Sequence, residues 1–418
     1  MTQARRVVIT GVGAITPIGN TAQEYLSGLK NGVSGASFIS AFDTEKFKTR
    51  FACEVKNFDV NQFIDRKEAR RMDRFTHFAL VCADEAIKDA GLDREGSFDP
   101  DRTGVIWGSG IGGLDTFLKE SVEYAKGDGT PRFNPFFIPK MIADIAPGHI
   151  SIKYGFRGPN FSTVSACASS TNALIDAYIM IKLGKADVVV SGGSEAAITE
   201  AGIGGFNAMQ ALSTRNDSPE TASRPFDKDR DGFVMGEGGA CLILEELEHA
   251  LARDAKIYAE VAGFGLSADA HHITAPHPDG LGAANVMRYA IQDAGLSPAD
   301  IDYINVHGTS TPLGDIAEVK AIQKVFGDHV YQLNISSTKS MTGHLLGGAG
   351  AVEALATVFA ICHDFVPPTI NHFTDDPDLD PAINFTFNKA QQRTVRAALS
   401  NTFGFGGHNA SILFKKYH

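Results

Sequence analysis

The sequence is poor in cysteine and has no long uninterrupted run of apolar residues. Its five cysteines are Cys53, Cys82, Cys167, Cys241 and Cys362. Their number is odd, their spacing is irregular and no two form a C-x-x-C pair, so neither a disulfide framework nor a zinc site is expected. The stretch Ala354–Cys362 is too short to span a bilayer, and the first residues do not have the pattern of a secretory signal peptide. We therefore expect a cytoplasmic protein without membrane insertion.

Positive charge is also in deficit. The chain has 38 lysines and arginines against 49 aspartates and glutamates, a net charge of −11, which argues against binding to nucleic acid. Residues 65–74 depart from this balance, because they gather Lys67, Arg70 and Arg71 at a predicted helix start. Such a run is usually a solvated helix face. On an acidic protein it can also bind an acidic partner.

Strand-like runs alternate with helical segments along the 418 residues, which predicts an α/β fold with buried sheets. The order of elements begins again after about residue 255. We therefore expect two duplicated halves, residues 1–255 and 256–418, packed as one unit. The predicted strands are Arg6–Thr10 (ending in a turn at residues 11–13), Thr103–Trp107, Asp187–Ser191, Ala240–Glu245, Tyr258–Phe264, Asp302–Val306, Ile335–Ser337, Ala397–Thr402 and Ala410–Phe414. The predicted helices are Phe75–Ala90, Glu246–Arg253, Ala283–Ala294, Ile316–Phe326 and Gly350–Ile361.

Cys167 stands at a predicted turn from a strand into a helix. A β-rich run ends at Ala166, and apolar residues at helical spacing follow as far as Gly184. The free N–H groups and the positive end of a helix stabilise a thiolate and offer donors to an oxyanion. A free cysteine is more often a small buried apolar residue, which is our interpretation of the other four. Position alone leaves both descriptions open for Cys167.

Two histidines each follow directly after a predicted strand. His307 lies in YINVHGTSTPLGD, and His344 ends STKSMTGH just before a glycine-rich helix start. In parallel sheets, functional groups gather at the carboxyl ends of strands. A single histidine of this kind is more often structural. Two in matching positions, together with Cys167, favour a catalytic site.

Two weaker patterns point to other ligands. Residues 108–113, GSGIGG, follow a strand and formally fit G-x-G-x-x-G, which alone is a weak sign of dinucleotide binding. His271, His272 and His277 lie in a proline-containing stretch, but no carboxylate or cysteine spacing there supports a metal site. We expect neither a dinucleotide nor a catalytic metal.

Three segments in combination resemble the β-ketoacyl-acyl-carrier-protein synthase family, and most closely its type II branch. They are Ala166-Cys167-Ala168, VHGTST at residues 306–311 and KSMTGH at residues 339–344. The resemblance extends from Val7 to NTFGFGG at residues 401–407. It implies a thiolase-like fold, in which two duplicated α/β halves form a five-layered α-β-α-β-α sandwich, usually as a homodimer. It also implies elongation of an acyl chain by decarboxylative condensation with malonyl-carrier protein in fatty-acid biosynthesis.

The resemblance assigns catalytic roles by position. Cys167 would accept the acyl chain from the phosphopantetheine of acyl carrier protein. His307 and His344 would stabilise the enolate that forms when the malonyl group loses CO₂, and Lys339 would orient the histidines and tune their electrostatics. The backbone N–H groups of Cys167 and Phe405 would form the oxyanion hole. No cofactor is required for the chemistry, because loss of CO₂ generates the nucleophile.

The remaining implied roles concern substrate entry, docking and structure. Phe405 would gate access with Phe403 beside it, Thr309 and Thr311 would bind the pantetheine arm, and Ile111 would line the acyl pocket, as is typical of the type II branch. The positions that match the carrier-docking face are Lys67, Arg70 and Arg71. Those that match a structural Na⁺ or K⁺ site are Asn305, Val306, Glu353, Ser400 and Asn401.

Two other interpretations of the resemblance remain, namely a polyketide-type ketosynthase subunit and a thiolase-like enzyme that acts on acyl-CoA. Non-catalytic polyketide subunits lack the nucleophilic cysteine that this chain keeps, and thiolases have a second cysteine instead of the pattern at His344. The chain departs from the family at His408, where threonine is usual, and in the proline-containing segment Ala270–Pro278, which borders the expected substrate entrance.

Overall fold

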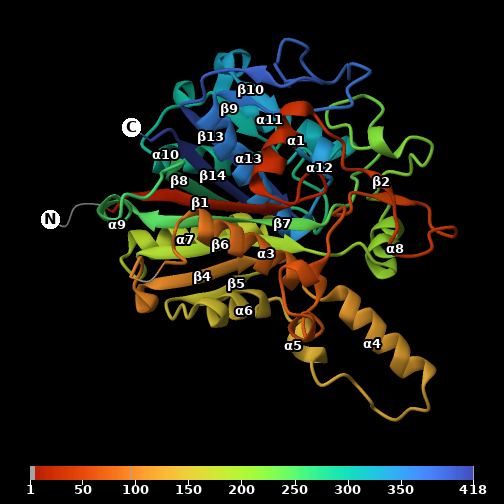
Figure 1. Cartoon of the computed structure of the whole chain (residues 1–418). Coiled ribbons are helices and arrows are strands. Elements are labelled where there is room, and N and C mark those ends of the chain that lie inside the picture. Colours follow the sequence, from red (N-terminus) through yellow and green to blue (C-terminus); the bar gives the residue numbers. More distant parts are fainter. Residues whose placement is uncertain (1–4, 95, 418) are drawn as a thin grey trace.

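One ten-stranded sheet crosses the middle of the molecule (Figure 1). The structure is a computed structural model and describes residues 5–94 and 96–417. The strands of this sheet are β1 (Val7–Ile15), β4 (Thr103–Gly108), β5 (Asn160–Thr163), β6 (Val188–Glu195), β7 (Gly238–Glu246), β8 (Ala259–Ala268), β9 (Tyr303–Asn305), β10 (Asn334–Ser336), β13 (Ala397–Gly404) and β14 (His408–Lys415). Two small sheets pair β2 (Ser37–Phe38) with β3 (Phe51–Ala52), and β11 (Phe365–Val366) with β12 (Gln391–Gln392).

The strand order follows the same pattern in two halves. From one edge inward the sheet reads β5-β4-β6-β7-β1, and from the other edge it reads β10-β9-β13-β14-β8, so β1 and β8 pair in the middle. When the strands of each half are counted in chain order, both halves read third, second, fourth, fifth, first. The predicted duplication of an α/β unit is therefore confirmed. The boundary between residues 255 and 256 stays a prediction.

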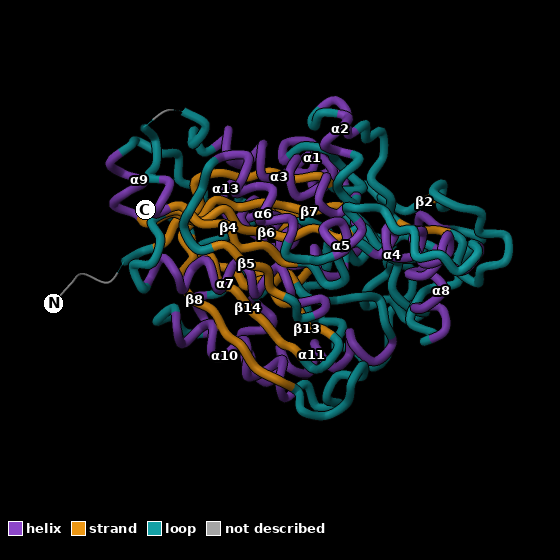
Figure 2. The backbone as a smooth tube through the Cα atoms, turned by 90° about the horizontal axis from the view of Figure 1, so that it is seen from below, coloured by secondary structure: helices purple, strands orange, loops and turns teal. Residues whose placement is uncertain are grey.

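Helices cover both outer faces of the sheet and fill the space between its halves. On the first half, α3 (Arg74–Asp89) packs against β1, β6 and β7; on the second, α10 (Leu281–Asp293) packs against β8 and β14. Between the halves lie α7 (Ser169–Lys182) and α13 (Ala349–His363), which contact each other and strands of both halves. Figure 2 shows helices on either side of the band of strands. The layers run α-β-α-β-α, so the predicted thiolase-like sandwich is confirmed.

The other helices are shorter or lie at the periphery. The α-helices are α1 (Ala22–Asn31), α2 (Arg66–Ala69), α4 (Leu114–Lys126), α5 (Phe137–Met141), α6 (Ile145–Tyr154), α8 (Glu200–Ala208), α9 (Leu247–Ala252), α11 (Pro312–Phe326) and α12 (Lys339–Thr342). The 3₁₀ helices are η1 (Val60–Gln62), η2 (Pro100–Arg102), η3 (Ala166–Ala168), η4 (Pro219–Thr221), η5 (Pro298–Asp300), η6 (Gly327–Gln332) and η7 (Leu346–Gly348).

Strand β6 illustrates how the central strands are buried on both faces. Val188 and Val190 pack against the outer core around α3, while Val189 faces the central helices. A strand covered on both sides reads as a continuous apolar run, which is why the sequence identifies it. The strand is parallel to β4 and antiparallel to β7, and it continues past the predicted end at Ser191 to Glu195. The buried Glu195 is taken up below.

The predicted turn at residues 11–13 is wrong, because β1 continues through these residues to Ile15. A Cβ on Gly11 would stand 2.3 Å from the carbonyl oxygen of Ala86, and a Cβ on Gly13 would stand 2.1 Å from that of Cys82. The two glycines therefore let α3 lie directly on the strand. They mark a close approach of helix and strand rather than a reversal of the chain.

The segment Leu346–His363 is long and apolar enough to cross a membrane by length and composition, but 89% of it is buried inside the fold. It comprises η7 and α13. It is longer than the predicted stretch Ala354–Cys362, because the small residues that precede this stretch are also helical. Its apolar surface is that of a core helix between two layers of strands.

Candidate active site

The strand-to-helix turn predicted around Cys167 is present as η3, between β5 and α7. Ala166 has a φ of 51°, a left-handed conformation that alanine adopts only when its surroundings impose it. Ser169 fixes the turn, since its hydroxyl donates to the Ala166 carbonyl at 2.7 Å and accepts the N–H of Ser165 at 2.9 Å. The thiol of Cys167 is thereby held at the start of the central helix.

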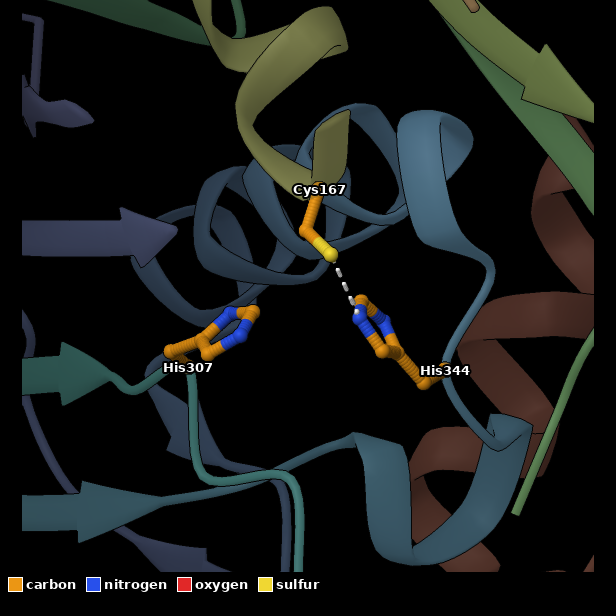
Figure 3. Close-up of side chains that lie close together, drawn as sticks. All are labelled: Cys167, His307 and His344. Atoms are coloured by element: carbon orange, nitrogen blue, oxygen red, sulfur yellow. Dashed lines mark hydrogen bonds between the residues drawn. The ribbon is translucent and has the colours of Figure 1, made fainter. Parts of the chain in front are cut away.

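Both predicted histidines converge on this thiol (Figure 3). Nε2 of His344 lies 3.0 Å from Sγ of Cys167, a residue 177 positions away in sequence. The ring centroids of His307 and His344 are 5.3 Å apart, and the rings are nearly perpendicular at 88°. One ligand-type atom from each of the three side chains lies within 4.8 Å of the other two. The fold therefore assembles a thiol and two imidazoles around a single point.

The backbone of His344 is pinned to a neighbouring segment. Its N–H donates to the carbonyl of Val234 at 2.7 Å, and its carbonyl accepts the N–H of Gly236 at 2.9 Å. The ring of Phe233 meets the imidazole edge to face at 5.3 Å. These contacts fix the ring in a single orientation toward the sulfur.

A carboxylate that the sequence did not single out positions His307. Glu318 on α11 accepts the N–H of His307 at 2.9 Å and that of Gly308 at 2.8 Å. It is 2% exposed, and burial raises its pKa to about 7, against the opposing hydrogen bonds. The only available signal in the sequence was an acidic residue on the apolar face of a predicted helix.

Lys339 is buried beside the site and forms an ion pair with Glu353. Burial, and after it the positive charge of Lys339, hold the pKa of His307 and of His344 well below the usual value. Both imidazoles are therefore neutral at pH 7, and each keeps one N–H to donate.

Burial raises the pKa of the Cys167 thiol to about 12, against the opposing effects of Lys339 and of the backbone N–H of Phe405. The sequence predicted a stabilised thiolate from the helix start alone. Desolvation outweighs that effect because the side chain is only 7% exposed. The resting group is a thiol, with the neutral His344 beside it and the N–H of Phe405 directed at the sulfur.

A cavity of about 610 Å³ opens onto these side chains. All five residues predicted to contact or gate the substrate line it together with the thiol and imidazoles: Ile111, Thr309, Thr311, Phe403 and Phe405. The hydroxyls of Thr309 and Thr311 lie 3.0 Å apart. Residues 274–277 of the proline-containing segment form part of the wall, so this departure from the family borders the cavity.

The structure does not bring the predicted docking residues to the cavity. Lys67, Arg70 and Arg71 are exposed on and after α2, and none of them lines it. The guanidinium of Arg71 also forms an ion pair with Glu68 at 2.9 Å. His408 is exposed at the start of β14 and likewise lies outside the cavity wall.

The residues that match a monovalent cation site form a cluster of buried oxygens. Oδ1 of Asn305, Oε2 of Glu353 and Oγ of Ser400 are all buried without a hydrogen-bond partner in the described residues. Asn305 and Ser400 are paired neighbours on β9 and β13, and the Asn305 amide donates to the main-chain carbonyl of Glu353 at 3.4 Å. Oxygen atoms of this kind suit a hard cation. The Asn401 side chain already has partners, so Asn401 and Val306 would offer only their carbonyls.

The glycine-rich loop at residues 108–113 has no free N–H groups for a dinucleotide phosphate at its centre. The N–H groups of Gly110, Ile111 and Gly112 all donate to the carboxylate of Glu195. The loop is thus committed to a side chain of the protein. Glu195 is a second buried carboxylate that binds the backbone beside the site, and its one mark in the sequence is a lone acid at the end of an apolar strand.

A duplicated sandwich with a thiol and two imidazoles gathered at the start of its central helix is typical of an acyltransferase of the condensing type. Comparison with known families gives the same result at a finer level: the profile of the beta-ketoacyl synthase N-terminal domain matches residues 4–250, and that of the C-terminal domain matches residues 258–373. The chain belongs to the beta-ketoacyl synthase family.

Individual relatives match along the whole chain. The 3-oxoacyl-[acyl-carrier-protein] synthase 2 of Synechocystis sp. is 52% identical over 415 residues, 99% of each chain, and that of Staphylococcus aureus is 50% identical over 417 residues, 100% of each. Among solved structures, a beta-ketoacyl synthase from Burkholderia phymatum STM815 has a TM-score of 0.91 at 35% identity, covering 99% of this chain and 100% of that one. The chain is therefore a condensing enzyme of fatty-acid elongation.

Proposed function

We propose that this protein lengthens an acyl chain carried on acyl carrier protein by two carbons, through decarboxylative condensation with malonyl-carrier protein. The observation that carries the proposal is the convergence of Cys167 with His307 and His344 on one cavity, with one atom of each within 4.8 Å of the others. Each of the three groups has a separate role in a two-stage reaction.

The first stage transfers the acyl group to sulfur. The sulfur of Cys167 attacks the carbonyl carbon of the acyl thioester, a new carbon–sulfur bond forms, and the pantetheine thiol leaves with the proton that the cysteine gave up. The oxyanion that forms in passing is held by the N–H groups of Cys167 and Phe405. Gly404 permits this arrangement, since a Cβ there would stand 2.7 Å from the carbonyl oxygen of Ser165.

The second stage makes the carbon–carbon bond. The carbonyl oxygen of the malonyl thioester accepts hydrogen bonds from His307 and His344, and the electron pair released by loss of CO₂ becomes an enolate on that oxygen. The enolate carbon attacks the acyl-cysteine carbonyl, and the sulfur of Cys167 leaves. Burial, and after it the positive charge of Lys339, keep both imidazoles neutral, and the same positive charge favours the developing negative charge. No cofactor is consumed, because CO₂ loss supplies the electron pair.

The neighbouring residues have supporting roles in this proposal. Thr309 and Thr311 bind the pantetheine arm, Ile111 bounds the acyl chain, and Phe403 and Phe405 control entry. The positions of the two rings fit such a gate. The ring centroid of Phe403 lies 5.7 Å from that of His307, and the ring centroid of Phe405 lies 6.4 Å from that of Phe206. The cluster of unpartnered oxygens around Asn305 is proposed to hold a structural Na⁺ or K⁺.

Acyl carrier protein is the proposed partner, and the basic run on α2 is its proposed dock. A structural neighbour with a TM-score of 0.89 and 34% identity, covering 100% of each chain, is described as a polyketide ketosynthase in complex with its acyl carrier protein. An acidic carrier would be attracted to Lys67, Arg70 and Arg71 even though the whole chain has a net charge of −11.

We also propose a homodimer in the cytoplasm. An arm formed by α4 and α5 extends from the body of the molecule (Figure 1). It exposes several large apolar side chains, an uncommon feature of a surface that stays in contact with water. They are Phe117, Val122, Tyr124, Phe133, Phe136 and Ile138. A second copy of the chain is the proposed cover.

Product analysis tests the proposed function. Purified protein supplied with acyl-carrier and malonyl-carrier is expected to release CO₂ and form a 3-oxoacyl-carrier that is two carbons longer, with an acyl adduct on Cys167 by mass spectrometry. Equal rates with acyl-CoA would favour the thiolase-like alternative. Repeated condensation on the same chain, without reduction between cycles, would favour a polyketide ketosynthase. Formation of neither product nor adduct would overturn the proposal.

The neutral histidines predict that neither imidazole titrates in mild acid. Because burial holds the pKa values of His307 and His344 well below 6.5, both rings stay neutral as the pH falls from 8 to 6. Burial raises the pKa of Glu318 and of Glu353 to about 7, so a change in the rate of malonyl-carrier decarboxylation in this range should come from these carboxylates. A sigmoidal change with a midpoint between about pH 6 and 7 that persists in the double variant Glu318→Gln, Glu353→Gln would contradict this. The unfolded chain binds protons on both histidines in this range, so the histidines should lower stability as the pH falls below about 6.5, while the two carboxylates act in the opposite direction.

A further inference from the structure

We infer that Glu195 is a positioning residue that sets acyl chain-length selectivity by holding the cavity wall at Ile111. The inference rests on the proposed function, because it concerns how the same cavity measures its acyl chain. Nothing in the amino-acid pattern around Glu195 suggests a catalytic group, and its carboxylate does not line the cavity. We therefore expect Glu195 to act indirectly, through the loop at residues 109–112 that its carboxylate binds.

Glu195 ends strand β6 as a carboxylate with 0% exposure, and no lysine, arginine or histidine among the described residues forms an ion pair with it. A buried charge without a counterion is costly unless hydrogen bonds replace its hydration. Five donors do so here. They are the N–H groups of Gly110 at 2.8 Å, Ile111 at 3.2 Å, Gly112 at 3.3 Å and Gly347 at 3.0 Å, and the hydroxyl of Ser109 at 3.1 Å.

The two carboxylate oxygens hold different segments. Oε1 accepts from Ser109, Ile111 and Gly112, and so fixes the backbone that carries the Ile111 side chain. Oε2 accepts from Gly110 and Gly347, and so ties this loop to the segment that follows His344. The two segments touch, because a Cβ on Gly347 would stand 2.0 Å from the N of Gly110. The carboxylate of Glu195 thus connects the loop that carries Ile111 to the segment that follows His344.

The side chain of Ile111 depends on this support. It is 41% exposed, it lines the cavity and it projects from a loop in which its neighbours are glycines and a serine, so the position of the side chain follows that of the loop backbone. The far end of the loop has an anchor of its own, since the N–H of Gly113 donates to the carbonyl of Met141 at 2.9 Å. Between that anchor and β4, Glu195 accepts the N–H groups of Gly110, Ile111 and Gly112, and the last of these is shared with the hydroxyl of Ser109 at 3.2 Å.

Glutamine at position 195 tests the charge with little change of shape. An amide has one oxygen and one NH₂ group. In either orientation of the glutamine amide, the NH₂ group replaces an oxygen that accepted hydrogen bonds. It then faces the donors Gly110 and Gly347 in one orientation, and Ile111 and its neighbours in the other. In both cases the loop loses part of its support, and Ile111 no longer defines a fixed end of the acyl cavity. Discrimination between chain lengths should therefore decrease.

The experiment measures acylation of Cys167 by a graded series of acyl-carrier substrates, from short chains to chains longer than the cavity accepts. For Glu195→Gln, the ratio of kcat/KM between the best and the worst chain should fall about tenfold, the effect of losing a hydrogen bond to a charged group. Glu245→Gln is the matched control. Glu245 is also fully buried at the end of a strand, but it pairs with Arg253 and His249 away from the cavity. This control should lose thermal stability and keep the wild-type ratio.

A double variant separates action through Ile111 from a general structural effect. In an Ile111→Ala background, Glu195→Gln should change the ratio less than about twofold, because the side chain that it positions is gone. If Glu195→Gln does not fold, Ser109→Ala removes one donor and should lower the ratio in the same direction, about threefold. An unchanged ratio in Glu195→Gln, or an equal change in both backgrounds, would overturn the inference. Failure of wild-type protein to become acylated would instead overturn the proposed function.

Discussion

Replacement of Cys167 by serine is expected to lower the rate of chain elongation by at least about a thousandfold. A hydroxyl is a much weaker nucleophile than a thiolate, and the buried site has no strong base to activate it, because the pKa of the neighbouring His344 is held well below its usual value by burial. The measurement is product formation from acyl-carrier and malonyl-carrier, combined with the intact mass of the protein. The acyl adduct should disappear.

Cys241→Ala is the matched control for that variant. Cys241 is fully buried in β7 and faces the outer core rather than the cavity. This control should keep both the adduct and most of the elongation rate. An adduct that survives in Cys167→Ser, or one that moves to another cysteine, would show that a different residue carries the acyl chain.

His307→Ala and His344→Ala are each expected to lower decarboxylation of malonyl-carrier by about a hundredfold, the usual effect of removing one donor to a developing oxyanion. Cys167→Ser should keep this partial reaction, because the enolate forms without any participation of the sulfur. Release of CO₂ from malonyl-carrier, without any acyl donor, measures the step. The two kinds of variant therefore separate the two stages.

A half-buried histidine elsewhere serves as the control for this second prediction. His77 on α3 has its pKa lowered by burial, like the catalytic pair, but Nε2 lies 2.9 Å from the carbonyl of Ala69 and the side chain does not line the cavity. His77→Ala should decarboxylate at the wild-type rate. Equal decarboxylation by Cys167→Ser and His307→Ala would contradict the assigned roles.

The sequence predicts where Cys167, His307 and His344 lie in the fold, because each stands near the end of a strand or the start of a helix. Such positions leave local marks, such as the helical spacing after Cys167 and the strand before His307. The alternation of strands and helices also predicts the duplicated sandwich. The convergence of the three groups required the fold itself, because β5 lies in one half of the sheet while β9 and β10 lie in the other.

The supporting carboxylates were not predictable in the same way. Glu195 and Glu318 act on backbone N–H groups of distant loops, and nothing in their own neighbourhood records which loop packs against them. The pKa of Cys167 was misjudged for a related reason, since the helix start is visible in the sequence while the depth of burial is not. The glycines of β1 were taken for a turn because the helix that presses on them lies far along the chain.

The pairing of β1 with β8 makes one hydrogen-bonded sheet of two repeats. The Cys167 thiol comes from the first repeat and both imidazoles come from the second, and α7 and α13 share one apolar interior between them. Cutting the chain near residue 256 would therefore yield two inactive fragments, each with a bare strand edge and an uncovered helix. Activity would return only when the fragments rejoined and re-formed the pairing of β1 with β8.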